Sequence, residues 1–328
     1  MAKTTRPAAG RRIIQWAAAL AVSMAAFSAQ AAWPEKAIQW VFTFAPGGGT
    51  DVVARVVTKY LSEELGVPVN VTNMAGGNQI PGIMHVLNSR PDGYVLLQEQ
   101  QANSAIKVIL KDLPFKLEDR TYGPLLVSGP NALVVNGKSG WNSLKDMVAF
   151  AKATPEKFSY ARIGGTSFTD MINLVLFEST GIDVSKVKAV DFPGVGPANV
   201  AVAGGHVMLG GGGAGSVVSL VQSGDLKALA VSGDQRVGVL PNTPSAVEAG
   251  FPDLYLVNWY GVSGPVGLPK EVMDRLSAAM KKISAKPEFV ADLEKIASVP
   301  FYKSPEESRA FVLKEAQLYR DLAAKYGL

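Results

Sequence analysis

Cysteine is absent from the 328-residue chain, and histidine occurs only twice, as His85 and His206. Without cysteine the protein has no disulfide bonds and no thiol nucleophile, so its fold depends on a hydrophobic core. The histidines and carboxylates form no group with the spacing of metal ligands. The composition therefore excludes thiol catalysis and gives no support to a metal centre.

Beyond the N-terminus the chain also has no excess of positive charge. The chain has 32 basic and 28 acidic residues. Four of the basic residues lie in the first 31 positions, namely Lys3, Arg6, Arg11 and Arg12, and no acidic residue does. The remaining chain therefore has 28 residues of each sign, and its charge gives no argument for nucleic-acid binding.

The first 31 residues are typical of a cleaved signal peptide. The basic start is followed by the mainly apolar segment 13–27, which is short for a membrane span, and by the small-x-small site Ala29-Gln30-Ala31. We expect export and cleavage near Ala31. A retained membrane anchor is the alternative, and Arg11-Arg12 leaves the twin-arginine route open. No cysteine follows the apolar segment, so a lipid-anchored lipoprotein is excluded.

The segment from Ile38 to Leu65 organises the rest of the chain. Residues 38–44 are apolar and rich in β-branched and aromatic side chains, which predicts a buried strand. Gly47, Gly48 and Gly49 form a sharp turn, and apolar residues then recur at helical spacing. A helix N-terminus has unpaired N–H groups and a partial positive charge, so this turn attracts anions. The alternative is an ordinary strand–helix turn.

Strands and helices alternate along the rest of the chain, which predicts an α/β fold with a parallel sheet flanked by helices. The expected strands are 68–72, 94–98, 158–161, 187–192, 206–209, 226–231 and 258–263, with short apolar runs at 125–127 and 132–135. The expected helices are 80–89, 143–153, 168–180, 198–203, 270–284, 287–296 and 305–326.

The order of these elements predicts two lobes. Residues 32–130 and 131–255 each contain an α/β unit, while the C-terminal helices have no sheet of their own. We therefore expect residues 256–328 to return to the first lobe, with crossings near Pro130 and near Leu254 to Asn258. Ligands of such sheets bind beyond the carboxyl ends of the strands, which places the site in one cleft between the lobes.

The second lobe repeats the glycine turn of the first. Tyr160 to Ser167 is again a strand, a glycine turn and hydroxyl residues before a helix, and further glycine loops occur at 191–197 and at 76–79. Several such turns around one cleft can hold an anion without arginine side chains. A ligand with a carboxylate at each end would bridge the lobes and favour closure. Glycine turns are, however, also common in α/β proteins that bind no anion.

Two enzyme-like patterns have weaker support. Gly210 to Gly215 matches G-x-G-x-x-G with Asp234 at the acidic position, but nicotinamide cofactors are scarce outside the cytoplasm and the following helix is short. A serine hydrolase using Ser167 or Ser216 is the enzyme alternative, although the G-x-S-x-G motif is missing. We therefore expect a protein that is not an enzyme and needs no cofactor.

The mature chain resembles, over nearly its whole length, the substrate-binding proteins of tripartite tricarboxylate transporters, also called Bug proteins. The segments that carry the resemblance are Trp33–Lys36, Phe44–Asp51, Pro91–Tyr94, Leu226–Val231, Leu240–Pro244, Glu248–Gly250 and Trp259–Gly261. The resemblance implies a monomeric periplasmic receptor with the type II-like Venus flytrap fold of periplasmic binding proteins. Such a receptor holds a small carboxylate through backbone amides and water. It delivers the ligand to membrane permease subunits or, in some cases, to a signalling sensor.

The chain departs from the family pattern in the loops of the second lobe. Asp170 stands in the region where the family has histidine, and Phe192-Pro193-Gly194 replaces Tyr-Lys-Gly. Residues 205–208 depart from the usual Gly-x-Val-Asp and are followed by the glycine run 210–213. We hypothesise a ligand bulkier than a four-carbon diacid, such as an aromatic carboxylate, in a pocket enlarged by the missing side chains.

The expected ligand contacts come from the glycine turns of both lobes. Glycine N–H groups should bind the carboxylate, and the hydroxyls of Thr50, Thr166 and Ser167 should donate to it. Asp51 would repel an anion, so it caps the helix, holds water or accepts from a ligand donor. The first-lobe set is Phe44, Ala45, Gly47, Gly48, Thr50 and Asp51, with Asn78 and Gln79 secondary, and the second-lobe set is Gly164, Gly165, Thr166, Ser167, Gly194 and Gly196.

Overall fold

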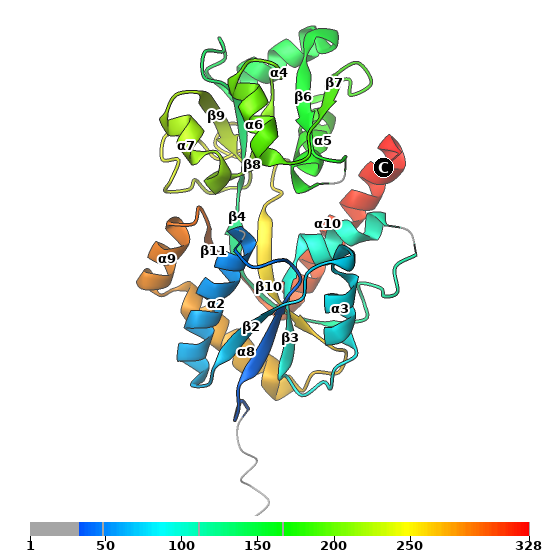
Figure 1. The fold of residues 1–328 in the computed structure, drawn as a ribbon, viewed down its shortest axis with the longest axis vertical. Coiled ribbons are helices and arrows are strands. Elements are labelled where there is room, and N and C mark those ends of the chain that lie inside the picture. The colour runs from blue at the N-terminus through cyan, green and yellow to red at the C-terminus, as the bar shows by residue number, and fades with distance from the viewer. Residues whose placement is uncertain (1–32, 48, 111, 166, 328) are drawn as a thin grey trace, which may run out of the picture.

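The computed structural model describes residues 33–327 except residues 48, 111 and 166. The expected signal peptide and the site candidates Gly48 and Thr166 lie outside these residues. The described chain forms two lobes joined by a narrow waist (Figure 1). None of its helices combines the length and the hydrophobicity that crossing a bilayer requires.

The first lobe is built on a six-stranded sheet in the order β11-β4-β10-β3-β1-β2. Strands β1 and β2 and strands β1 and β3 pair in parallel, whereas β10 is antiparallel to β3 and β4, and β11 is antiparallel to β4. Within this sheet the prediction of parallel pairing is therefore correct only for strands β1, β2 and β3. The strand bounds are β1 Ile38–Phe42, β2 Val69–Asn73, β3 Val95–Gln100, β4 Thr121–Gly129, β10 Asn258–Gly264 and β11 Val299–Lys303.

Helices cover both faces of this sheet. The predicted ranges of α8 and α10 are confirmed, whereas α9 ends two residues earlier than expected. Helix α2 packs its apolar side through Val53, Val57 and Leu61 into the core around Trp40. The helix bounds are α2 Gly49–Leu65, α3 Ile80–Leu87, α8 Lys270–Ser284, α9 Pro287–Glu294 and α10 Pro305–Tyr326. Short 3-10 turns follow β3, including η2 Gln101–Asn103 and η3 Ala105–Ile109.

The second lobe has a three-stranded sheet, in which β5 lies antiparallel to both β8 and β9, and a parallel pair β6–β7. A parallel bridge between Tyr160 and Leu209 joins the two parts. The predicted range of α5 is confirmed. The strand bounds are β5 Asn131–Asn136, β6 Ser159–Arg162, β7 Lys188–Asp191, β8 Gly210–Gly213 and β9 Leu226–Val231, and the helices are α4 Leu144–Ala153, α5 Phe168–Thr180, α6 Val195–Ala203 and α7 Val218–Gln222.

Strand β8 consists of glycine alone, and it corrects two expectations. The strand that we placed at 206–209 lies at 210–213. A Cβ atom on Gly210 would lie 2.7 Å from the Val202 side chain, and one on Gly211 would lie 2.5 Å from the Ala132 carbonyl oxygen. Neighbouring atoms therefore fill the space of the missing side chains at these positions. The explanation that this run enlarges the ligand pocket is wrong for them.

Three segments connect the lobes. The chain passes from β4 to β5 through Pro130 and returns to β10 at Asn258. The third connection is the C-terminal helix, whose end reaches the second lobe (Figure 1). There, Lys325 and Tyr326 both donate to the Glu178 carboxylate of α5, with donor–acceptor distances of 2.7 Å. Helix α10 therefore contacts both lobes.

Candidate ligand-binding site

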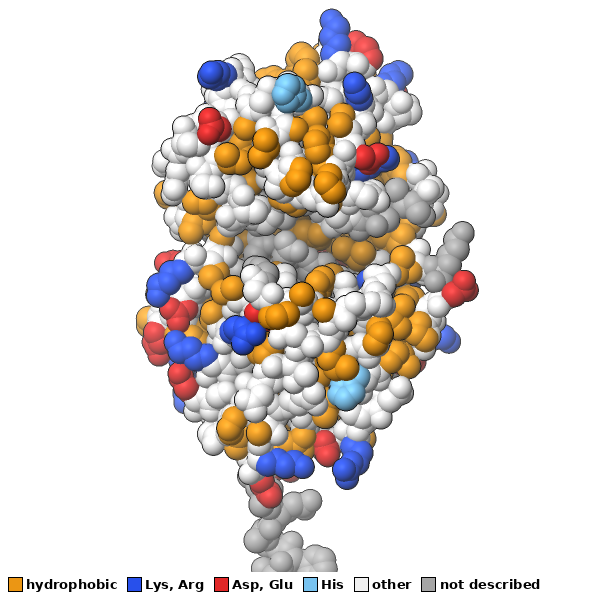
Figure 2. All heavy atoms as spheres, in the orientation of Figure 1, with side chains coloured by type: hydrophobic (Ala, Val, Ile, Leu, Met, Phe, Trp, Pro, Cys, Tyr) orange, Lys and Arg blue, Asp and Glu red, His pale blue; other side chains and the backbone are white. Residues whose placement is uncertain are grey.

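Two cavities lie in the cleft between the lobes. A space-filling view shows a groove at this level with hydrophobic side chains along its edges (Figure 2). The smaller cleft cavity has a volume of about 300 Å³, and first-lobe residues such as Phe44 and Asn78 face Ser167 and Phe168 of the second lobe across it. The larger cleft cavity has a volume of about 510 Å³ and lies between Thr50 and the segment 213–216. Asn258 lines both, so the two cavities adjoin each other at this residue.

Asp51 holds the glycine turn of the first lobe. Its carboxylate is buried and accepts from the Gly47 N–H at 3.0 Å, from Arg55 Nε at 2.8 Å and from Asn73 Nδ2 at 2.9 Å. Although burial favours the neutral acid, the hydrogen bonds from Asn73, Arg55 and Gly47 hold the pKa of Asp51 below its usual value. Asn73 also donates to the Phe44 carbonyl at 3.0 Å. These bonds fix the chain at the start of α2, where it faces the second lobe (Figure 1).

Asp170 holds the corresponding turn of the second lobe. It is also buried, and its carboxylate accepts from the Ile163 N–H at 2.8 Å, the Ser167 N–H at 3.0 Å and the Ser167 hydroxyl at 2.8 Å. The Ser167 oxygen accepts in turn from the Asp170 N–H, which completes a capping box at the start of α5. Asp170 therefore positions a loop of the cleft.

These contacts show which hydrogen-bonding groups of the two turns are already used within the protein. The Asp51 carboxylate is occupied by the Gly47 N–H, which precedes α2, and by the side chains of Arg55 and Asn73, so Asp51 holds the turn itself. The Gly47 N–H already donates to Asp51, so an anion would have to compete for it. The Ser167 hydroxyl likewise donates to Asp170. In this structure both acids therefore shape the cleft loops from inside the protein.

The loop before α3 has an unusual backbone. Gly76, Gly77, Asn78 and Gln79 have φ angles of 97°, 51°, 52° and 69°, so four successive residues lie in the left-handed region. This conformation is strained for Asn78 and Gln79, and such strain concentrates at functional sites. Both side chains line the smaller cleft cavity. The structure thus brings the two secondary candidates of the first lobe into the site.

The remaining candidates have different surroundings. Phe44 and Ser167 line the smaller cleft cavity, and Thr50 lines the larger one. The other described candidates lie in loops of the two lobes: Gly165 is buried, Gly194 is half-buried, and Ala45, Gly47, Gly164 and Gly196 are exposed.

Three further polar residues line the smaller cleft cavity, and the sequence analysis missed them. They are Gln101, Lys107 and Asn258. Gln101 donates to the Asn258 side chain and accepts from the Trp259 N–H, so the start of β10 is tied to the end of β3. The available signal was the polar run 98–104, which follows a buried strand at the carboxyl edge of the sheet.

The enzyme-like patterns do not form the sites they resemble. Gly210–Gly213 is a strand, and the next α-helix begins only at Val218 and has five residues. The Ser216 hydroxyl donates to the Gly213 carbonyl, and the Ser167 hydroxyl donates to Asp170. Neither hydroxyl is hydrogen-bonded to a histidine in the described part of the chain. Within that part, acids and histidines also form no group that could hold a metal ion.

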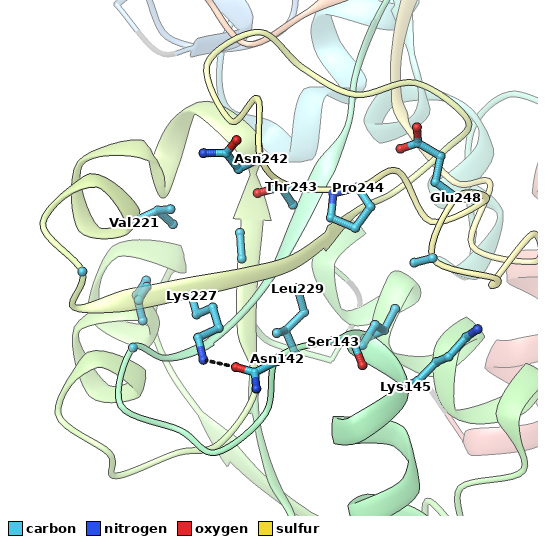
Figure 3. A pocket seen from close by; sticks show the side chains of 16 residues that line it. Asn142, Ser143, Lys145, Val221, Lys227, Leu229, Asn242, Thr243, Pro244 and Glu248 are labelled. Carbon is cyan, nitrogen blue, oxygen red and sulfur yellow. Dashed lines mark hydrogen bonds between the residues drawn. The ribbon is translucent and has the colours of Figure 1, made fainter.

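A cavity of about 610 Å³ lies in the second lobe beside β9 and the start of α4 (Figure 3). Two of its three charged lining residues, Lys227 and Glu248, are hydrogen-bonded within the protein, and the third, Lys145, is exposed. Lys227 Nζ donates to the Trp141 carbonyl at 2.8 Å and to Asn142 Oδ1 at 3.2 Å, and Glu248 accepts from Arg236 at 2.8 Å. The cleft cavities are therefore the better candidates for the ligand site.

The family model described as "Tripartite tricarboxylate transporter family receptor" matches residues 53–328. The chain belongs to this family. The receptor is 28% identical to Protein BugT of Bordetella pertussis over 298 residues, which cover 90% of both chains. It is 31% identical to a UPF0065 protein of Bordetella bronchiseptica over 308 residues, which cover 92% of the receptor and 89% of that protein.

Solved structures agree with this assignment. The receptor matches the periplasmic binding protein BugD with a TM-score of 0.67 and 26% identity, covering 90% of the receptor and 99% of BugD. Two structures from R. palustris, one with adipate and one with bound malate, match its fold with TM-scores of 0.69 and 0.66 at 23% and 24% identity; they cover 90% and 88% of the receptor and 98% and 99% of those chains. The expected α/β fold of two-lobe periplasmic solute-binding proteins is thereby confirmed, and the family consists of receptors rather than enzymes.

Proposed function

We propose that this receptor captures a small carboxylate in its interlobe cleft in the periplasm and delivers it to the membrane permease subunits of a tripartite tricarboxylate transporter. The observation that carries the proposal is the paired arrangement of Asp51 and Asp170. Each acid fixes a glycine turn and a helix start beside the cleft. Although the two carboxylates offset part of the positive potential of the helix starts, the turns that they hold border the cleft, and the two related structures from R. palustris contain the carboxylates adipate and malate.

A thermal-shift screen of the purified receptor tests this proposal. We expect selective stabilisation by one class of carboxylates among mono-, di-, tri- and aromatic acids. A ligand at about one hundred times its dissociation constant adds roughly 2.7 kcal/mol to the free energy of unfolding, which gives a readable shift. A receptor that responds to none of these acids would contradict the proposal.

Replacing Asp170 by alanine should weaken binding of the best carboxylate from that screen by at least about tenfold. The change leaves the Ile163 and Ser167 N–H groups without their acceptor, and it should also lower the free energy of unfolding by about 3 kcal/mol. Binding is measured by calorimetry and stability by urea unfolding.

The matched control is Asp146→Ala. Asp146 accepts from the N–H groups of Asn142 and Ser143 and completes the same capping box at the start of α4, but it is exposed. We expect a loss of about 1 kcal/mol in stability and unchanged affinity. Equal loss of affinity in both variants would show that helix capping in general, rather than the cleft turn, controls binding.

A further inference from the structure

Lys107 is a buried lysine that lines the ligand cleft. It lies on η3, and only 6% of the residue is exposed. Its Nζ donates to Asn78 Oδ1 at 2.7 Å. In the described part of the chain no carboxylate lies within 4.0 Å of this Nζ. Burial lowers the pKa of Lys107 below the usual value of a lysine. The side chain is therefore a desolvated cation with one neutral partner.

The same lobe shows how this protein stabilises a cation that it buries as part of its core. The Arg120 side chain is fully buried, and its Nη1 lies 3.0 Å from the equally buried Glu99 carboxylate. Burying an unpaired charge is costly, and an acid partner offsets that cost. Arg120 has such a partner within the fold, whereas Lys107 faces a cavity between the lobes. The missing negative charge at Lys107 is one that a ligand can supply.

Lys107 is the one charged residue among the described residues that line the smaller cleft cavity. The uncharged polar residues of the lining are Asn78, Gln79, Gln101, Ser167 and Asn258, and the Gln79 Oε1 atom is buried without a hydrogen-bond partner. The larger apolar residues of the lining are Phe44, Ile106, Ile109, Leu110 and Phe168. The second carboxylate of a dicarboxylate would therefore have no cationic partner in this cavity.

We propose that Lys107 is the charge partner of the ligand and that the ligand is a monocarboxylate with an apolar body, either aromatic or branched aliphatic. Its carboxylate binds at Lys107 and Asn78, and its body lies between Phe44 and Phe168. This inference rests on the proposed carboxylate-binding function and adds to it a specific residue and a ligand class. The hypothesis of a bulkier ligand then rests on the apolar residues that line this cavity, and no longer on the missing side chains of residues 210–213.

Lys107→Met tests the proposal, because methionine keeps much of the side-chain volume and removes the charge. The probes are benzoate, phenylacetate, 4-methylpentanoate and succinate, measured by calorimetry and thermal shift. We expect the wild-type receptor to bind at least one of the three monocarboxylates more tightly than succinate. Lys107→Met should weaken that binding by at least about thirtyfold, and Lys107→Arg should retain part of it.

The stability of the ligand-free protein separates this role from a structural one. If Lys107 served only to hold Asn78, its replacement would lower the melting temperature. We expect Lys107→Met to melt at the same temperature as the wild type or higher, because it removes a buried unpaired charge. The control Lys116→Met changes an exposed lysine of the same lobe and should alter neither property.

The outcomes distinguish the proposal from the function on which it rests. Equal affinity of wild type and Lys107→Met overturns the role of Lys107 and leaves carboxylate binding intact. Preference for succinate overturns the ligand class. A lower melting temperature of Lys107→Met, with affinity lost only in proportion to it, assigns Lys107 a structural role and overturns the proposal. Absence of any response of the wild type to these and the screened acids contradicts the proposed function itself.

Discussion

Replacing Glu315 by glutamine should stabilise the receptor at pH 8 by roughly 4 kcal/mol and leave its stability at pH 4.5 nearly unchanged. Glu315 lies on α10 and is almost completely buried. Burial raises the pKa of Glu315 to about 8, even though hydrogen bonds from the Trp259 indole and the Tyr319 hydroxyl favour the ionised form. The neutral acid is therefore the form that suits the folded protein.

The direction of the pH dependence follows from these protonation states. The folded-state pKa of Glu315 lies above its unfolded value, so the folded protein binds more protons between the two. The stabilising contribution is complete below about pH 4.5 and is lost as the pH rises towards 8. A glutamine keeps one acceptor and one donor for Trp259 and Tyr319 but never ionises.

Urea unfolding at pH 4.5, 6 and 8 measures this effect. The control is Glu306→Gln, which removes an exposed carboxylate from the same helix. We expect the wild type and the control to lose stability as the pH rises, and Glu315→Gln to lose markedly less. If all three proteins show the same slope, the proton at Glu315 does not control stability in this range.

The second large effect is expected in the glycine strand. Gly211→Ala should lower the free energy of unfolding by about 3 kcal/mol, because the added Cβ would lie 2.5 Å from the Ala132 carbonyl oxygen. Strand β8 would have to move away from β5, with which it pairs. Gly213→Ala adds the same methyl group at the end of the strand, where no atom lies within 4 Å, and should change stability by less than about 0.5 kcal/mol.

Chemical unfolding of the two variants decides between two functions of the glycine run. A large loss for Gly211→Ala alone means that the glycines permit close packing in the second lobe. Similar stability of both variants would mean that space exists at Gly211 and would restore the idea of an open pocket there. Far-ultraviolet circular dichroism of each variant confirms that it has folded before its stability is compared.

The elements that the sequence predicted best are those with local signals. Helices α5 and α10 begin after Ser167 and Ser304, and each of these serines forms a capping box with an acid three residues later. Strand β11 was missed because its partner is β4, far away in sequence, and because Pro300 argues against a strand. Edge strands tolerate proline, but edge position is not visible in the sequence. The lobe boundaries at 130/131 and 255/256 stay a prediction.

The candidate site was predicted in outline only. Glycine turns and cap residues identified the two loops, since their chemistry is local. The role of Asp51 depends on Asn73, and the burial of Lys107 depends on how η3 packs in the folded protein. A lysine in a sequence is most often exposed, so nothing marked this one as a ligand partner. The proposal for Lys107 rests on the cavity that this residue lines and on no sequence motif.

Helix α10 connects the two lobes in addition to the two segments at Pro130 and Asn258. One hydrophobic cluster joins Ala105 of η3, Val312 and Tyr319 of α10 and Ile172 of α5, and Glu178 fastens the far end of the helix. Two lobes joined by two adjacent connections can rotate about the axis through them, but a third connection that lies away from this axis resists the rotation. Closing the cleft must therefore tilt α10 or release Lys325 and Tyr326 from Glu178. Because α10 packs against η3, either movement would also shift the turn that carries Lys107, the proposed charge partner of the ligand.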